Sequence, residues 1–594
     1  MRAKSQKTGG YQVFAVAGIN TVSFAMDATG ANTQGLLGFA VERHDPAENE
    51  RYFMQGFKVF KSVIPQPDKK TSVSTFEHPV QSFVWDDFTA KSDRQYDYYF
   101  YPVKGTPKNL DRSAKPIQIS VRTEPLFTNG EHDVFFNRGV ASSQAYARKF
   151  GNKAPDKQDT PAKKKEAADW LSRDLDDALL KFISQAKSGD TLLCCFYEFR
   201  YPPAALALRA AFDRGVKVRL IVDAKVNGSG TDKSFPREEN LQMLKDAGLK
   251  LGADVVLREA RSNDIQHNKF MVLLKGASQK PSEVWTGSTN LSLGGIHGQT
   301  NVGHWVRNAV VAASFRDYWK VLSTDPGGKD GDNTATKRQK NEALREAAEA
   351  IQAVPGGIAS IPKGVTPLFS PRTKLDALNL YVELVDKASD LACITLAFGI
   401  GKAFKDQLKD NTDQSHLSFL LLEKRDKPTA TNKDTFVYIN SRQNVYKAWG
   451  AYIRDPLYQW TRETNAMGLG LNKHVSYIHS KFLLRDPLGA DPIVVTGSAN
   501  FSEASTTAND ENMLIIRGNK RVADIYFTEF NRLFNHYYFR SVLETLNSTA
   551  NAQPGAGTDP DASLFLSEDG GWLKKYKPGS LRQKRVTIYK RMKI

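Results

Sequence analysis

The sequence has few cysteines and no long apolar run. Only three cysteines occur in 594 residues: Cys194 and Cys195 are adjacent in one apolar segment, and Cys393 lies in another. These positions indicate buried free thiols in a reducing compartment, and they spell neither a disulfide framework nor a zinc site. No stretch of about 18 consecutive apolar residues is present, which excludes a membrane-spanning helix.

The N-terminus also lacks the pattern of a secretory signal, because its apolar segment is short and breaks at Gly18. We therefore expect a cytoplasmic protein, with peripheral membrane contact and non-classical export left open. Acidic residues are outnumbered: 82 Lys and Arg stand against 65 Asp and Glu, a formal net charge of +17. This charge favours polyanionic partners, either nucleic acid or an anionic lipid surface.

The chain is too long for a single core, since cores stop growing at roughly 250 to 300 residues. Residues 1–125 hold short alternating segments separated by turns, such as YQVFAVAG and QYDYYFYPV. They predict an antiparallel β-sandwich. This part resembles a fibronectin type III or immunoglobulin-like module, and the sequence leaves its protein partner unknown.

Helical and strand patterns alternate in the rest of the chain, which predicts an α/β layer structure with a largely parallel sheet. The same order of patterns returns after Pro367, and the strand 218–223 has its counterpart in 419–423. The chain thus contains a tandem duplication.

Three segments rich in Gly, Pro or charge, 151–167, 324–341 and 551–563, are predicted to be unstructured. The last residues, KKYKPGSLRQKRVTIYKRMKI, are basic and contain no acid. They are either a solvated tail or a tail that binds polyanions.

Each half carries one copy of a short pattern, His-x-Lys followed by Gly-Ser-x-Asn. On a strand, His and Lys two positions apart lie on one face. Gly and Ser let a backbone approach a ligand, and Asn can hydrogen-bond it. The first copy consists of His267, Lys269, Gly287, Ser288 and Asn290, and the second of His479, Lys481, Gly497, Ser498 and Asn500.

Two facing halves would create a phosphate site with two imidazoles, two ammonium groups and two amides. One neutral His can attack phosphorus while the other, protonated, donates to the leaving oxygen. The lysines and asparagines would stabilise the charge that develops on the other oxygens. None of these roles needs a metal or another cofactor, and no carboxylate cluster suited to a hard cation lies near either copy.

At these residues the chain resembles the phospholipase D superfamily, whose signature is His-x-Lys-x4-Asp followed by Gly-Ser-x-Asn. The resemblance covers residues from about 130 to 545, and in the second copy Asp486, which we expect to be structural, completes the signature. The implied fold class is α/β, with two pseudo-twofold-related phospholipase D-like repeats of mixed sheets flanked by helices, preceded by the all-β sandwich. We place the boundaries at 1–125, 126–355 and 356–594.

The first copy departs from the signature, because Leu274 occupies the Asp position. Tyrosyl-DNA phosphodiesterases, which are in the same superfamily, also lack that Asp. Glu511 is the expected carboxylate partner of the distal nitrogen of His479, and the aligned stretch of the first half offers Gln299 or Thr300.

The resemblance implies that His267 is the nucleophile and His479 the acid. A carboxylate-supported His479 would favour the reverse.

The implied reaction is phosphodiester hydrolysis through a phosphohistidine, with transphosphatidylation when an alcohol replaces water. We expect a phospholipid substrate. The alternatives are a nuclease that acts on DNA or RNA by the same chemistry and, less favoured, a degenerate module that only binds phosphate. The catalytic set is expected to be His267, Lys269, Asn290, His479, Lys481, Asn500 and Glu511, with Gly287, Ser288, Gly497 and Ser498 binding substrate.

Overall fold

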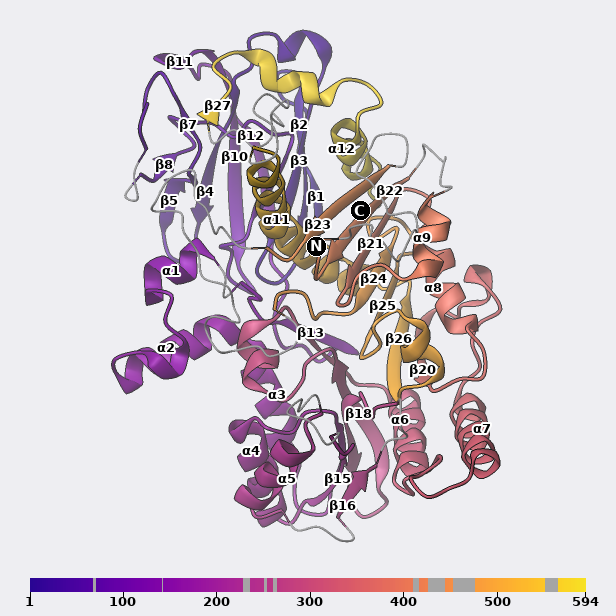
Figure 1. Ribbon diagram of the computed structural model, residues 1–594. Coiled ribbons are helices and arrows are strands. Elements are labelled where there is room, and N and C mark those ends of the chain that lie inside the picture. Colours follow the sequence, from indigo (N-terminus) through magenta and orange to yellow (C-terminus); the bar gives the residue numbers. More distant parts are fainter. Residues whose placement is uncertain are drawn as a thin grey trace.

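A computed structural model gives the fold of the chain (Figure 1). It describes residues 1–67, 71–140, 143–227, 235–249, 254–259, 264–409, 416–425, 444–451, 476–550 and 565–594. Among the helices of these ranges, none combines the length and the apolar composition that a membrane span requires. The predicted cytoplasmic location stays a prediction.

The N-terminal part is an all-β sandwich, as predicted. Its two antiparallel sheets pack face to face, with Phe24 of one sheet against Tyr98 of the other at a ring distance of 4.7 Å. The first sheet has the order β1 (Arg2–Lys4), β2 (Tyr11–Ala17), β3 (Val22–Ala28) and β9 (Val84–Asp87). The second has the order β11 (Asn109–Asp111), β10 (Gln95–Thr106), β4 (Gly38–Asp45) and β5 (Glu50–Phe53), and β12 (Ile117–Arg122) pairs with β10.

The next part is built on a mixed seven-stranded sheet. Its strands alternate between two cores, so that the adjacent Cys194 and Cys195 face opposite sides of the sheet, both as buried free thiols. The strand order is β13 (His132–Phe136), β19 (Val302–Val306), β18 (Lys280–Gly287), β17 (Lys269–Lys275), β14 (Thr191–Phe196), β15 (Lys217–Asp223) and β16 (Val255–Arg258). Its helices include α3 (Leu175–Ser184), α4 (Pro202–Asp213), α5 (Arg237–Asp246) and α6 (Ala309–Leu322).

A second mixed sheet repeats this order strand for strand. It runs β20 (Gly364–Ser370), β26 (Glu511–Arg517), β25 (Ile493–Gly497), β24 (Phe482–Arg485), β21 (Leu391–Leu396), β22 (Leu417–Leu422) and β23 (Val445–Trp449). Its helices are α8 (Asp376–Asp386), α9 (Lys402–Lys409), α10 (Glu503–Thr507) and the long α11 (Lys520–Ala550). The matching order confirms the predicted duplication and fold class, and both sheets contribute to one shared core with α6 and α11.

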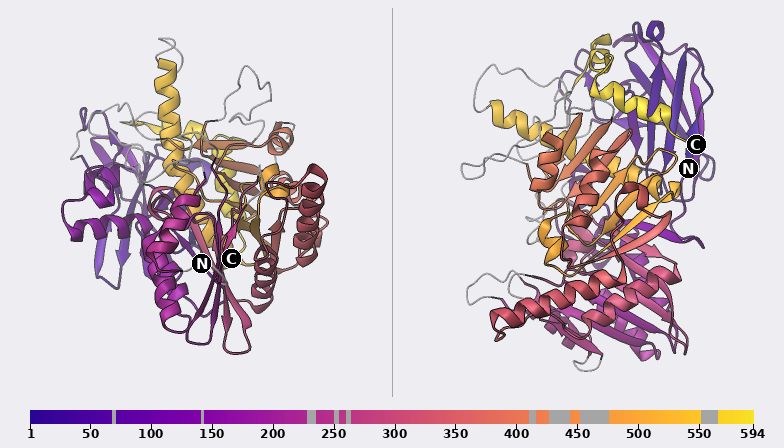
Figure 2. Two further views of the ribbon diagram at one scale, coloured as in Figure 1. Left: turned by 60° about the horizontal axis from the view of Figure 1, so that its bottom comes forward. Right: turned by 90° about the vertical axis from the view of Figure 1, so that its right-hand side faces the viewer.

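The basic C-terminal segment packs against the sandwich and the neighbouring core, so the first of the two expectations, a solvated tail, was wrong. Binding of polyanions by this segment stays a prediction. Figures 1 and 2 show it crossing the sandwich next to the N-terminal strands. Trp572, in the short helix Gly570–Tyr576, is buried in the sandwich core and donates its Nε1–H to the carbonyl of Leu36 at 2.9 Å. Helix α12 (Leu581–Arg591) buries Val586 and Tyr589, three residues apart on one face.

Two segments that we predicted to be unstructured contain helices. Helix α2 (Pro161–Ser172) begins after Thr160, whose hydroxyl accepts a hydrogen bond from the N–H of Lys163. Helix α7 (Thr334–Ile351) begins after Asn333, which caps it in the same way. Capping residues outweighed the Lys and Gly content on which the prediction depended. The third segment, 551–563, lies outside the described residues.

Candidate active site

The two His-x-Lys segments meet where the two sheets abut. Each histidine directly follows a residue that forms a short bridge to the other half: Gln266 pairs with Asp510, and Ile478 pairs with Thr300. His267 and His479 are only 5% and 4% exposed. The pseudo-twofold arrangement therefore places both imidazoles in one buried site within a single chain.

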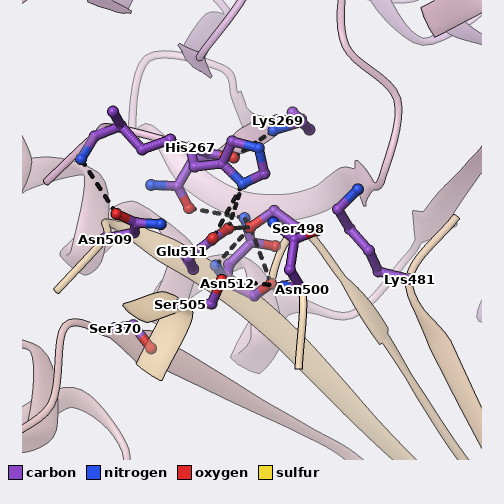
Figure 3. A network of polar contacts seen from close by, with 12 residues as sticks. His267, Lys269, Ser370, Lys481, Ser498, Asn500, Ser505, Asn509, Glu511 and Asn512 are labelled. Atoms are coloured by element: carbon purple, nitrogen blue, oxygen red, sulfur yellow. Dashed lines mark hydrogen bonds and ion pairs between the residues drawn. The ribbon is translucent and has the colours of Figure 1, made fainter. Parts of the chain in front are cut away.

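The carboxylate of Glu511 holds His267, not His479 as we predicted. The two carboxylate oxygens lie 2.9 and 3.0 Å from Nδ1 of His267 (Figure 3). The hydroxyl of Ser498 donates to the same carboxylate at 2.6 Å. Glu511 is the first residue of β26 and follows Asp510, which forms the bridge to Gln266 of the first half. Its side chain therefore faces the histidine of the other repeat.

An amide occupies the equivalent position for His479. Asn301 places its Oδ1 2.9 Å from Nδ1 of His479 and accepts the hydroxyl of Ser288 at 2.8 Å. Its Nδ2 donates to the carbonyl of Gly295 at 2.8 Å, which fixes the orientation of the amide. Nδ1 of His479 must therefore carry the proton, and its Nε2 is left for chemistry.

The sequence predicted Gln299 or Thr300 in this position, and Asn301 was missed. Thr300 instead accepts the backbone N–H groups of His479 and Ser480, at 3.1 and 3.3 Å, and the backbone of Gln299 joins the preceding turn. A signal was present, since Asn301 and Glu511 each lie 13 residues after the Ser of their Gly-Ser-x-Asn motif.

Each lysine contacts the backbone of its own histidine, although both histidines precede the strands β17 and β24 and the predicted strand geometry therefore does not apply to them. The Nζ of Lys269 donates to the carbonyl of His267 at 2.6 Å, and that of Lys481 to the carbonyl of His479 at 2.5 Å. Burial lowers the pKa of Lys269 to about 8. Burial and the charge of Lys269 lower the pKa of Lys481 well below its ordinary value. Two crowded cations and one carboxylate make a site that favours a bound anion.

The electrostatics leave His267 neutral. Burial lowers its pKa to about 4, against the opposing attraction of Glu511. Burial pushes the pKa of Glu511 up, but His267 and Lys269 outweigh it and leave that pKa below its ordinary value. His267 is therefore an imidazole that donates Nδ1–H to a carboxylate and keeps a lone pair on Nε2. Burial, Lys481 and Lys269 lower the pKa of His479 well below its ordinary value.

The glycines and serines that we predicted to bind substrate have other contacts. Gly287 and Gly497 have φ of 137° and 157°, and a Cβ on either would lie 2.2 Å from a carbonyl oxygen of the next strand. The serine hydroxyls are engaged with Asn301 and Glu511. The two serines therefore hold the partners of the histidines in place, and the two glycines allow each motif to lie close to the next strand.

The two motif asparagines keep an acceptor available. In the described part of the chain, the Oδ1 atoms of Asn290 and Asn500 are buried and have no hydrogen-bond partner. Buried amide oxygens without partners are uncommon, which marks these two as candidates for contact with a ligand.

Asp486 directly follows β24, at the end of the strand that is away from His479. Its carboxylate accepts the backbone N–H groups of Ser389, Asp390 and Leu391, at 2.7 to 3.1 Å, and so holds the turn before β21. In the first half Asp190 performs the same task by accepting the N–H of Gly276 at 2.8 Å. Leu274 therefore leaves the site itself intact.

Two further carboxylates position the histidines and were missed. Asp223 accepts the N–H of Gln266 at 3.0 Å, and Glu423 accepts those of Ser476, Tyr477 and Ile478 at 2.7 to 3.0 Å. Burial raises the pKa of each carboxyl to about 7. Asp223 and Glu423 are the last residues of the segments 218–223 and 419–423, whose correspondence indicated the duplication. Their matching positions could therefore have marked both carboxylates as candidates.

Comparison with known families identifies this arrangement. The family model described as "Cardiolipin synthase, PLD-like domain" matches residues 179–322 and 420–534, one segment in each repeat. The chain belongs to the phospholipase D superfamily. Members of this superfamily act on phosphodiesters. None of the curated proteins matches the chain.

Three solved structures are similar to parts of this chain. A polyphosphate kinase from Porphyromonas gingivalis is 12% identical, with a TM-score of 0.35; the similarity covers 59% of this chain but only 46% of the kinase. A phosphatidylserine synthase from Haemophilus influenzae is 12% identical, covers 71% and 94%, and has a TM-score of 0.43. The phospholipase D family member Nuc from Salmonella typhimurium is 25% identical, covers 24% and 83%, and has a TM-score of 0.19.

Proposed function

We propose that the protein is a metal-independent phosphodiesterase that works through a phosphohistidine on His267. The observation behind this proposal is that the two imidazoles have different partners, a carboxylate for His267 and an amide for His479. A neutral His267 that donates Nδ1–H to Glu511 has a basic Nε2 lone pair, and the carboxylate stabilises the positive imidazole ring that attack creates. Both the family pattern and the carboxylate contact now favour His267 as nucleophile.

In the first step Nε2 of His267 forms a bond to phosphorus, and the bond from phosphorus to the leaving oxygen breaks. That oxygen takes a proton from Nε2 of His479 and departs as an alcohol. In the second step water attacks phosphorus and gives a proton to His479, the P–N bond breaks, and His267 is restored. Lys269, Lys481 and the motif asparagines stabilise the charged oxygens in both steps.

The neutral amide beside His479 suits this acid and base role. A carboxylate would favour the protonated imidazole throughout, whereas Asn301 allows His479 to lose its proton in the first step and regain it in the second. The phosphodiester anion brings the charge that favours protonation of His479 between two lysines.

A phospholipid is the substrate that we favour. Three large apolar side chains, Val226, Leu293 and Phe398, are 64%, 50% and 68% exposed. They follow β15, the first Gly-Ser-x-Asn turn and β21, at the ends of the elements that carry the site. Exposed apolar groups at these positions, on a protein of net charge +17, support contact with an anionic lipid surface. An alcohol acceptor in the second step would give transphosphatidylation.

Nucleic acid remains the second candidate, because the same net charge suits a phosphate backbone. The test is a side-by-side turnover assay in EDTA on mixed phospholipid vesicles and on single- and double-stranded DNA and RNA, with His479→Ala as the control. Release of a headgroup alcohol that the substitution abolishes would support the lipid proposal. Substitution-sensitive cutting of nucleic acid would reverse the choice of substrate, and no turnover on any of them would favour the phosphate-binding module.

A further inference from the structure

One buried asparagine outside both motifs contacts the partner of His479. Asn137 directly follows β13 and is 1% exposed. Its Oδ1 accepts the backbone N–H of Asn301 at 2.9 Å. Its Nδ2 lies 3.4, 3.0 and 2.6 Å from the carbonyl oxygens of Gly295, Ile296 and Gln299. The amide of Asn137 thus has one orientation only, because carbonyl oxygens cannot accept from another oxygen.

The three carbonyls belong to a turn that ends just before Asn301. Residues Gly294–Gly298 form a single π-helical turn, a rare element that often lies at functional sites. The carbonyl of Gly295 accepts from both Asn137 and Asn301. A Cβ on Gly295 would lie 2.2 Å from the carbonyl oxygen of Asn290, so the turn also packs against the motif asparagine.

The orientation of Asn301 matters because its two ends have opposite effects. With Oδ1 towards His479, the side chain accepts Nδ1–H and permits protonation of Nε2. With the amide inverted, its NH₂ would face Nδ1–H and oppose the imidazolium form that the acid requires. A carboxylate such as Glu511 has no such inverted state.

Among the described residues of the second half, a serine and not an asparagine stands at the position of Asn137. Phe136 pairs with Val302 in the first half as Phe369 pairs with Asn512 in the second, so Ser370, opposite Glu511, stands at the position of Asn137. Figure 3 shows Ser370 beside the network without a drawn contact to it. Of the two histidine partners, Asn301 therefore has an asparagine beside it and Glu511 has a serine.

We propose that Asn137 is a positioning residue for the acid and base step, because it fixes Asn301 so that the amide oxygen holds Nδ1–H of His479. This inference rests on the proposed function, in which His479 protonates the leaving group. Loss of Asn137 should impair a reaction that needs this proton and spare one that does not.

The test compares two phosphodiesters on the same protein samples, one with a simple alkyl alcohol as leaving group and one with p-nitrophenol, whose anion leaves without protonation. For Asn137→Ala and Asn137→Asp, single-turnover cleavage of the alkyl ester should slow about 10- to 100-fold. The first-turnover burst of p-nitrophenol should be nearly unchanged. The ratio of the two rates is insensitive to the fraction of folded protein, since misfolding lowers both rates equally.

Ser370→Ala, the matched change in the other half, should leave the ratio as in the unsubstituted protein, and Asn301→Ala should reproduce the Asn137 variants. Equal loss on both substrates, or no loss on the alkyl ester, would overturn the positioning role. If the unsubstituted protein itself shows no p-nitrophenol burst, the proposed function fails instead, so the two failures are distinguishable.

Discussion

Replacing Glu511 with Gln keeps the shape of the side chain and removes its charge. The carboxylate oxygens lie 2.9 and 3.0 Å from Nδ1 of His267, and no other described carboxylate is paired with that ring. When Nε2 attacks phosphorus, the ring becomes positively charged and faces the carboxylate. The variant should therefore destabilise the transition state that leads to the phosphohistidine, with little effect on substrate binding.

The size of the effect follows from the type of contact. A hydrogen bond to a charged group contributes about 1.5–3 kcal/mol and a neutral one about 0.5–1.5 kcal/mol, a difference of about 1–2 kcal/mol. This corresponds to a roughly 5- to 30-fold slower attack. The hydroxyl of Ser498 must also turn, because it donates at 2.6 Å to an oxygen that an amide nitrogen would replace. An inverted amide would select the wrong imidazole tautomer, and the loss would then approach about 10⁴-fold, as in serine protease triads.

The assay is the rate of the p-nitrophenol burst, measured by rapid mixing at saturating substrate, with thermal unfolding as the check on folding. Glu511→Gln should slow the burst by at least the range given, whereas Asn301→Ala, which alters the partner of the other histidine, should not. A burst rate that is unchanged in Glu511→Gln, or equally slowed in both variants, would refute the assignment of Glu511 to the nucleophile.

Four further outcomes are expected. Because burial lowers the pKa of His267 to about 4 and only its neutral form attacks, kcat/KM should decline on acidification only as pH falls through about 4; a midpoint near 6.5 would contradict this. On the alkaline side, Lys269 loses its charge through its pKa of about 8, so activity should fall as pH rises through that value, as a pH profile in constant ionic strength would show. Burial raises the pKa of Asp223 to about 7, above its value in the unfolded chain. The protonated group therefore stabilises the fold at low pH, and this contribution is lost as pH rises through 7. In urea titrations, Asp223→Asn should flatten this pH dependence of the unfolding free energy. Trp572→Ala should lower the unfolding free energy by about 3–5 kcal/mol because it empties a core position of the sandwich, and a variant as stable as the unsubstituted protein would show that the C-terminal segment is dispensable there.

The repeated order of elements could be predicted from the sequence because period and composition act locally. The strands 218–223 and 419–423 are short apolar runs, and each continues into a polar residue that the structure places near a histidine. The fold class follows from such runs and from the helices between them. The basic C-terminal segment was misjudged because its charge hid the spacing of Val586 and Tyr589, which bury one face of α12.

Contacts between the halves were beyond the reach of the sequence. Glu511 lies close to His479 along the chain, yet it faces His267, because the pseudo-twofold axis exchanges the partners of the two imidazoles. Asn137 carries no motif at all, and only the pairing of β13 with β19 brings it to Asn301. Local patterns thus supplied the reacting groups, and the tertiary fold supplied the groups that orient them.

The most direct test of the account is to locate the covalent intermediate. The protein would be mixed with a p-nitrophenyl phosphodiester, quenched in alkali to preserve phosphohistidine, and mapped by peptide mass spectrometry, with His479→Ala used to slow the second step. The proposed mechanism predicts a phosphoryl adduct on His267 that accumulates in His479→Ala and is absent from His267→Ala. An adduct on His479, or turnover without any adduct, would contradict it.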